Sequence, residues 1–364
     1  MSLYSQNFYR LLYDWYDSNH RVLPWRETTN PYYIWLSEVI LQQTRVVQGM
    51  EYYHRFITAY PTIEQLAAAK EDEVLRLWQG LGYYSRARNL HKAAKMIVGQ
   101  PYMADRATRF PATFDELRAL PGVGDYTAGA IASFAYDLPY PALDGNVYRV
   151  LARLFDCDIP FDTTAGKKQF HKLAEELLDR QHPRQFNTAI MEFGALHCLP
   201  ASPDCQTCPV QAFCKAHAAG TAGLLPVRKQ RPTLRNRYFS YTIYITPARQ
   251  TLLHQRTAKD IWQHLYEFPL VEHDSEADWL KFSKLSIPSD RSPKETRTLN
   301  SKLTFTHILS HQRLHARFNL VPVNELPTLP DTIAVTWEDL DNYALSRLTL
   351  KALEKLACCP IARS

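Results

Sequence analysis

The chain has 364 residues, of which 46% are hydrophobic, and a formal net charge of +5. This length predicts two domains, and the mildly positive charge permits a polyanionic partner without requiring one. No apolar run approaches the roughly 18 residues that a membrane helix needs, and the N-terminal residues lack the apolar core of a signal peptide. We therefore expect a soluble, cytoplasmic protein rather than a membrane-spanning or secreted one.

Helical patterns fill the first two hundred residues. Asn30 is a suitable N-cap and Pro31 a suitable first residue for a helical run that continues to Tyr60, just before Pro61. Further helical patterns, separated by turns rich in glycine and proline, occupy residues 62–79, 85–100, 113–120, 126–136, 147–155 and 167–181. The sequence thus predicts an all-α domain over residues 1–223.

The composition changes after this helical region. Residues 224–237 are rich in proline and arginine and lack periodicity, which is typical of a linker. Strand patterns follow at residues 238–246, 250–256, 303–311 and 314–323, and a helical pattern at 346–357. We therefore predict a second, α+β domain over residues 238–364.

Four of the seven cysteines lie close together in the pattern C-x6-C-x2-C-x5-C, as Cys198, Cys205, Cys208 and Cys214. The odd total and the lack of a signal peptide argue against a disulfide scaffold. Four thiolates within such a short loop can bind zinc or an iron–sulfur cluster, and spacing alone does not choose between them.

The stretch PGVGDYTAGAIA, residues 121–132, predicts a tight turn at Gly122, Val123 and Gly124 that leads into a helix. Such a turn presents backbone N–H groups to an anion. A nucleotide-binding glycine loop follows a strand, whereas a helical pattern precedes this one. A DNA backbone phosphate is therefore favoured as the anion, with a plain αα-hairpin as the alternative.

Two carboxyl groups stand out by their surroundings. Glu38 lies among apolar residues of a predicted buried helix, where loss of hydration raises the pKa of a carboxyl group and suits a general acid. A satisfied buried carboxyl group is the alternative. Asp144 precedes a predicted helix and is either a second reactive carboxylate or an N-cap. Amide and aromatic residues cluster around loops, and two of them, Gln43 and Tyr83, suit insertion into a base stack, or else the edge of a core.

Six ordered motifs together resemble the adenine DNA glycosylases of the MutY type, in the helix–hairpin–helix base-excision superfamily. They are LPWR, WLSEVILQQTRV, GLGYYSRARNLHKAA, LPGVGDYTAGAI, LDGNVYRVLAR and the cysteine loop. The resemblance runs from about Leu23 to Cys214 and continues more weakly through IWQHLYEFP and HILSHQRLH. It implies a monomeric enzyme that hydrolyses the N-glycosidic bond of adenine opposite 8-oxoguanine or guanine in double-stranded DNA, after flipping the base out.

The resemblance also implies roles for particular residues. Glu38 would protonate adenine and Asp144 would stabilise the sugar cation, with Tyr126 and Asn146 lining the site. Trp25 and Arg26 would line the adenine pocket, Gln43 and Tyr83 would enter the duplex, and a helix–hairpin–helix over residues 114–133 would hold a phosphate. The cysteine loop would hold one four-iron–four-sulfur cluster.

Position 126 separates the possible activities. Relatives that also cut the DNA strand carry a lysine there, which forms a Schiff base with the sugar, and a phenol cannot do so. Tyr126 therefore favours a monofunctional glycosylase, and we expect its hydroxyl to bond near the sugar or Asp144. The alternatives are a bifunctional glycosylase for oxidised pyrimidines and an iron–sulfur electron carrier or redox sensor on DNA.

The second domain resembles the NUDIX-like recognition domain of the same family. It lacks the glutamate-rich box of NUDIX hydrolases, so nucleotide hydrolysis is not expected. Leu309, Ser310 and His311 stand where the family has Phe-Ser-His, a loop that reads 8-oxoguanine. Leu309 departs from that motif, which leaves the packing of the loop open. Thr188 stands where relatives often carry Glu or Gln, and no role is assigned to it.

Overall fold

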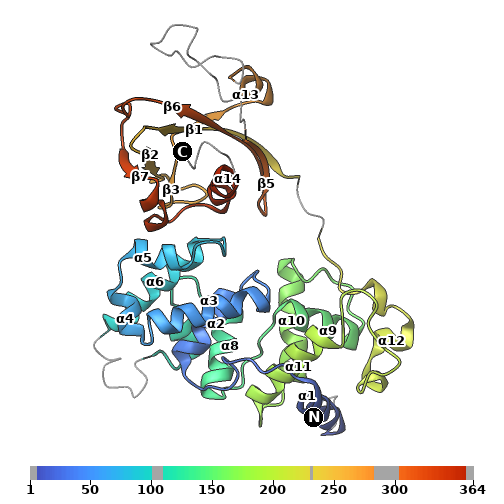
Figure 1. Ribbon diagram of the computed structural model, residues 1–364. Helices are drawn as coiled ribbons and strands as arrows, with labels where there is room; N and C mark the ends of the chain where they lie inside the picture. The colour runs from blue at the N-terminus through green and yellow to red at the C-terminus, as the bar shows by residue number, and fades with distance from the viewer. Residues whose placement is uncertain (1–5, 101–109, 230–232, 283–302, 358–364) are drawn as a thin grey trace. The chain divides into compact units, whose positions relative to one another are not determined.

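The computed structural model of the protein describes residues 6–100, 110–229, 233–282 and 303–357. The chain divides into two compact units, Met1–Ala68 with Asn89–Gln230 and Ala69–Arg88 with Arg231–Ser364. The first unit is helical and the second contains the strands (Figure 1). No helix in the described ranges is long and apolar enough to cross a membrane.

Helices occur wherever the first two hundred residues have helical patterns, although the patterns at 31–60 and 62–79 each contain two helices. The helices are α1 (Gln6–Asn19), α2 (Pro31–Leu41), α3 (Val46–Ala59), α4 (Ile63–Ala68), α5 (Glu71–Leu77), α6 (Ser85–Val98), α7 (Phe114–Arg118), α8 (Asp125–Tyr136), α9 (Gly145–Phe155), α10 (Thr164–Leu177), α11 (Pro183–Leu196) and α12 (Lys215–Ala219), with short 3₁₀ turns at Gln211–Phe213 and Ala222–Leu224. Helix α5 and the start of α6 belong to the second unit.

The long helix predicted from Pro31 to Tyr60 is wrong in one respect, because two helices replace it. Its start is confirmed, since Asn30 Oδ1 accepts a hydrogen bond from the Tyr32 amide over 3.0 Å. The helix ends at Leu41, and Gln43 takes a left-handed conformation with φ of 57°. A residue in that conformation interrupts the helical path. Apolar spacing does not reveal this break, because helices on both sides of it bury apolar residues.

The predicted helical hairpin is confirmed. Thr113 caps α7 by accepting from the Glu116 amide, and Gly124 is the N-cap residue of α8. Between the helices, Gly122 has φ of 77°, and a Cβ there would lie 2.8 Å from the Cβ of Asn89. Glycine is therefore required at position 122 both for its backbone conformation and for the close approach.

Helix packing in the first unit brings three segments together. Helix α2 packs against α3 and α8, α8 also contacts α7 and α11, and α9 packs against α10, α11 and α12. Helix α2 is buried along almost its whole length. These contacts bring together the middle of α2, the first turn of α8 and the start of α9. The three segments carry Glu38, Tyr126 and Asp144.

The second unit contains the predicted α+β fold. Its strands are β1 (Arg235–Ile245), β2 (Gln250–Gln255), β3 (Tyr266–Glu267), β4 (Leu270–His273), β5 (Leu303–Ile308), β6 (Gln312–Pro322) and β7 (Thr332–Thr336), with helices α13 (Glu276–Phe282) and α14 (Arg347–Ala357). One sheet has the order β4-β1-β6-β5, with β1 and β6 parallel, and the other has the order β3-β2-β7. Strand β1 begins at Arg235, so its first three residues lie inside the segment predicted as a linker, and Arg237 is buried.

Candidate active site and cysteine loop

A buried carboxyl group lies at the centre of the helical unit. Glu38 is 4% exposed on α2. The Tyr126 hydroxyl on α8 donates to Glu38 Oε2 over 2.6 Å, and Arg26 Nη1 lies 4.0 Å from Oε1. Burial raises the pKa of Glu38, while Arg26 and the Tyr126 hydrogen bond lower it and the charge of Asp144 raises it. The environment therefore favours the protonated form of Glu38 beyond its ordinary range.

The second carboxyl group, Asp144, is the N-cap of α9. Its Oδ1 accepts from the amides of Asn146 and Val147 over 2.9 and 2.8 Å, and its Oδ2 accepts from Asn146 Nδ2 over 2.8 Å. Burial raises the pKa of Asp144, but these hydrogen bonds and Arg26 oppose the rise. Three donors fix the carboxylate in place and stabilise its charged form more than the single donor of Glu38 does.

The hydrogen-bond partner of Tyr126 in the structure is Glu38, whereas a bond near the sugar or Asp144 was expected. Its hydroxyl bonds to Glu38, while its coupling to Asp144 is electrostatic, and burial raises the pKa of the phenol well above its usual range. Tyr126 therefore stays neutral and acts as a donor.

Arg149 connects the Asp144 cap to the cysteine loop. Its Nη2 donates to Asn146 Oδ1 over 3.0 Å and to the Gly194 carbonyl, and its Nε donates to the Cys198 carbonyl over 2.7 Å. Asn146 in turn donates to Asp144. The Asp144 carboxylate and the first cysteine are thus joined by two side chains, Asn146 and Arg149.

Trp25 and Arg26, predicted as one pocket, do line a single cavity. The cavity is lined by Tyr16, Trp25, Arg26, Thr28, Phe134, Arg184, Gln185 and Thr188. The Arg26 guanidinium lies 3.9 Å from the centre of the Phe134 ring, and its buried Nη1 has no hydrogen-bond partner among the described residues. Thr188 Oγ1 donates to the Arg184 carbonyl within its own helix. Arg26 therefore retains an unused donor beside Glu38.

The backbone groups of the hairpin turn differ in how accessible they are to a ligand. The Val123 amide already donates to the Leu120 carbonyl over 3.1 Å, and the Val123 side chain is buried. A Cβ at Gly124 would meet no atom within 4 Å, so the backbone there is open to a ligand. Gln43, which precedes α3, is exposed.

Tyr83 and the predicted recognition loop lie within the second unit. The Tyr83 and Ser310 hydroxyl oxygens are 2.5 Å apart, and the Tyr83 side chain is 47% exposed. Leu309 packs against the core of this unit, and its amide donates to the Gln312 carbonyl. Leu309 is therefore anchored in the core of this unit, while Ser310 and His311 stay exposed.

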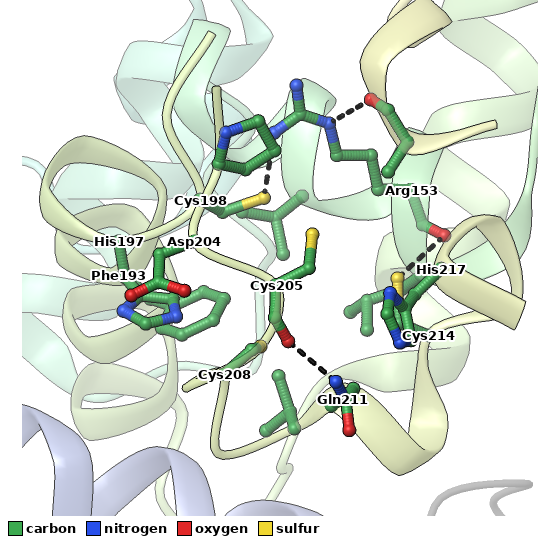
Figure 2. A pocket seen from close by; sticks show the side chains of 15 residues that line it. Arg153, Phe193, His197, Cys198, Asp204, Cys205, Cys208, Gln211, Cys214 and His217 are labelled. Carbon is green, nitrogen blue, oxygen red and sulfur yellow. Dashed lines mark hydrogen bonds between the residues drawn. The ribbon is translucent and has the colours of Figure 1, made fainter. Parts of the chain in front are cut away.

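The four clustered cysteines are free thiols that line one cavity (Figure 2). Burial raises the pKa of Cys208 to about 12 and that of Cys214 above its usual range. Arg153 Nη1 lies 3.2 Å from Cys198 Sγ. No group of three or more His, Cys, Asp or Glu side chains among the described residues is arranged to hold a single metal ion. A soft four-sulfur donor set with an adjacent cation fits an anionic metal–thiolate group.

Two family models match this chain, and their order follows the two predicted domains. Residues 36–180 match the HhH-GPD superfamily base excision DNA repair proteins, and residues 240–355 match the NUDIX domain. An adenine DNA glycosylase of Buchnera aphidicola subsp. Baizongia pistaciae is 32% identical over 92% of this chain and 92% of its own length. The chain belongs to the adenine DNA glycosylase family. These enzymes of base-excision repair act on N-glycosidic bonds, as the resemblance implied.

Other relatives agree with this assignment to the adenine DNA glycosylases. An adenine DNA glycosylase of Rattus norvegicus is 34% identical over 93% of this chain and 76% of its own length. A solved structure of a thermostable thymine-DNA glycosylase is 27% identical, with a TM-score of 0.52, and covers 58% of this chain and 95% of its own. This thymine-DNA glycosylase is thus about the size of the helical region of the chain.

Arg149 and Arg153 were not predicted from the sequence as buried residues near the cysteine loop. They lie four residues apart on α9, a spacing that places two side chains on one face of a helix, and both are buried. The available signal was the pattern itself: two arginines on the face of an otherwise apolar helix that precedes the cysteine loop. That pattern predicts buried cations near a group of thiolates.

Proposed function

We propose that this enzyme removes adenine opposite 8-oxoguanine or guanine from double-stranded DNA and leaves the strand intact. The hydrogen bond between Tyr126 Oη and the buried Glu38 carboxyl group carries the proposal. It places an acid with a raised pKa next to a neutral phenol, at the position where strand-cutting relatives have an amine. The site therefore favours acid-assisted base release over Schiff-base chemistry.

Glu38 supplies the proton that adenine needs in order to leave. The acid donates its proton to a ring nitrogen of adenine, and the N-glycosidic bond breaks with its electron pair on the base. The sugar becomes an oxocarbenium-like cation. Water then adds to the anomeric carbon, and its proton returns to Glu38. The products are free adenine and an abasic site, and the acid is regenerated.

Asp144 stabilises the positive charge that develops on the sugar. Its three hydrogen-bond donors stabilise the charged form of the carboxylate and hold it in place, so it requires little reorganisation as the cation forms. One neutral and one ionised carboxyl group is the division of labour found in glycoside hydrolysis. Asn146 acts as a positioning residue, since it holds Asp144 from one side.

The flipped adenine enters the cavity lined by Trp25 and Arg26. A base must leave the duplex before chemistry can reach it. The buried Nη1 of Arg26 is free to donate to an acceptor on the base edge. Gln43 and Tyr83 would enter the space that the base vacates, and the backbone at Gly122 and Gly124 would hold a phosphate, since the Val123 amide is already bonded.

The loop at Ser310 and His311 reads the opposite base. Both side chains are exposed, and Leu309 anchors the loop in the core of the second unit. The short contact between Ser310 and Tyr83 brings the proposed reader and the proposed intercalating residue together within that unit. This supports preference for 8-oxoguanine through polar contacts with its modified edge.

Cys198, Cys205, Cys208 and Cys214 hold a four-iron–four-sulfur cluster in this proposal. The cluster supplies a one-electron centre and a rigid cross-link within the loop. The residues of the chain do the rest: Arg149 transmits the position of the loop to Asn146 and Asp144. A broad absorbance shoulder near the visible and bound iron, with no zinc, would distinguish the cluster from a zinc site.

Excision assays on three labelled duplexes test the proposal. The duplexes carry adenine opposite 8-oxoguanine, adenine opposite guanine, and thymine glycol. We expect alkali-dependent breaks on the adenine strand of the first two and no action on the third. Cleavage at thymine glycol without alkali would identify the bifunctional alternative. Tight binding with no excision would identify a redox sensor instead.

A further inference from the structure

Arg153 is a buried cation whose partners are almost all neutral. It is 2% exposed. Its Nε donates to the carbonyls of Ala222 and Leu225, its Nη1 to Leu199 O and Cys198 Sγ, and its Nη2 to Pro200 O. Among the described residues, no aspartate or glutamate forms an ion pair or hydrogen bond with this guanidinium. Within the part of the chain that the structure describes, its only partner that can carry a full negative charge is therefore the Cys198 sulfur.

Arg149, one turn earlier on α9, repeats this pattern. It is 6% exposed, and its partners are two carbonyls and the Asn146 amide oxygen. A buried charge without a counter-charge costs several kcal/mol. Two such cations on one helix face indicate that an anion belongs at the cysteine loop.

We propose that Arg153 is the counter-charge of the iron–sulfur cluster, and that it raises the cluster's reduction potential and secures its retention. The inference rests on the proposed cluster. A four-iron–four-sulfur core of charge +2 held by four thiolates has a net charge of −2, which supplies the anion that the two arginines lack. Net charge and hydrogen bonds to sulfur set the potential of such clusters, and a nearby cation favours the more negative, reduced state.

Arg153 also joins the two ends of the loop. Leu199 and Pro200 follow the first cysteine, whereas Ala222 and Leu225 lie after the last, and one guanidinium bonds to all four carbonyls. Arg153 thus contacts both the cluster site and the segment that leads out of the helical unit. Binding of the cluster therefore stabilises the packing of residues 222–225 against the loop.

Two variants separate the charge of Arg153 from its role as a clamp. Arg153→Met removes the charge at similar length, and Arg153→Lys keeps the charge but loses most of the carbonyl bonds. Arg10→Met is the control, because Arg10 is an exposed arginine of α1. For each full-length protein we would measure iron per chain, the absorbance shoulder, the reduction potential by film voltammetry, and stability in urea with the cluster present and removed.

We expect Arg153→Met to shift the potential to more negative values and to lose iron to a chelator roughly 10- to 100-fold faster. Arg153→Lys should keep a potential closer to that of the wild type, and Arg10→Met should match the wild type throughout. Arg153→Met should lower stability more in the loaded protein than in the cluster-free protein, whereas a purely structural clamp would cost the same in both. If Arg153→Met does not fold, Arg153→Gln, which also removes the charge, replaces it in the measurements of potential and iron retention.

The failure of each idea is distinguishable. A wild-type protein that holds zinc or no metal would contradict the proposed cluster itself. A wild-type protein that holds iron, with Arg153→Met unchanged in potential and in retention, would overturn the role of Arg153 and leave the cluster standing. An equal loss of stability with and without the cluster would also overturn it.

Discussion

The Tyr126 hydroxyl donates a 2.6 Å hydrogen bond to Glu38 Oε2, from the first turn of α8 to the middle of α2. This bond lowers the pKa of Glu38 while burial raises it by a larger amount. The two effects leave a carboxyl group that retains its proton above its ordinary range but stays oriented by a donor. The tyrosine is therefore part of the acid's environment, in addition to marking the absence of an amine.

Removing the Tyr126 hydroxyl tests that relationship. In Tyr126→Phe the Glu38 pKa should rise, because the hydrogen bond that stabilises the carboxylate is gone. The alkaline limb of the excision rate should move to higher pH, and the plateau should fall roughly tenfold, as expected for the loss of one hydrogen bond to a charged group. Single-turnover rates from pH 5 to 9 measure both.

Tyr13→Phe is the matched control for this substitution. Tyr13 also donates to a carboxylate, Asp179 Oδ2 over 2.8 Å, in the same unit. Its replacement should leave the pH profile in place. An alkaline limb that moves to lower pH in Tyr126→Phe would contradict the assigned role.

Glu38 should reduce stability at neutral pH. Its pKa in the folded protein is raised above the ordinary value of 4.5, so between these values the folded state binds more protons than the unfolded state. Stability contributed by Glu38 then falls as pH rises, by up to about 1.4 kcal/mol per pH unit in this window. Glu38→Gln should be close to neutral near pH 4.5 and stabilising at pH 8. Urea unfolding at several pH values would measure this, and a stabilisation that shrinks with rising pH would refute it.

A lysine at position 126 should add the missing lyase chemistry. Tyr126→Lys places an amine beside the carboxyl pair, where it can attack the anomeric carbon and form a Schiff base. Borohydride should then trap a covalent adduct with DNA that holds adenine opposite 8-oxoguanine. Tyr126→Met, which has no amine, is the control and should give no adduct. Absence of trapping in active Tyr126→Lys would mean that this side chain does not face the sugar.

The two glycines of the hairpin should differ in their tolerance of alanine. Gly122→Ala requires a left-handed alanine and a 2.8 Å approach to the Cβ of Asn89, so we expect a loss of about 1–3 kcal/mol in unfolding free energy. DNA affinity should fall as well, since the turn is distorted. Gly124 has φ of −94°, and a Cβ there would meet no atom within 4 Å. Gly124→Ala should therefore lower the unfolding free energy by less. Equal effects of the two substitutions on unfolding would argue against the strain at Gly122.

Local patterns predicted much of this fold because each depends on neighbouring residues. Asn30 and Pro31 mark the start of α2, and glycine at position 122 marks the hairpin turn. The break at Gln43 was not predictable in the same way. No glycine or proline lies there, and a left-handed conformation at a glutamine has no local signal in the sequence.

The same distinction between local and long-range features applies to the candidate site. Glu38 and Asp144 could be selected from their local context and from the resemblance. The partner of Tyr126 could not, because it depends on the side-by-side packing of α2 and α8, 88 residues apart along the chain at the bonded pair. The burial of Arg149 and Arg153 was not predicted for a related reason, because arginine on a helix usually faces water.

The most direct test of the central claim is a single-turnover reaction with DNA that carries adenine opposite 8-oxoguanine, divided into samples with and without hot alkali. Wild-type protein should release adenine, with strand breaks only after alkali. Glu38→Gln should bind the same duplex but release the base at least roughly 100-fold more slowly, while Glu51→Gln, an exposed glutamate of α3, should match the wild type. Strand breaks without alkali, or unchanged excision by Glu38→Gln, would contradict the account.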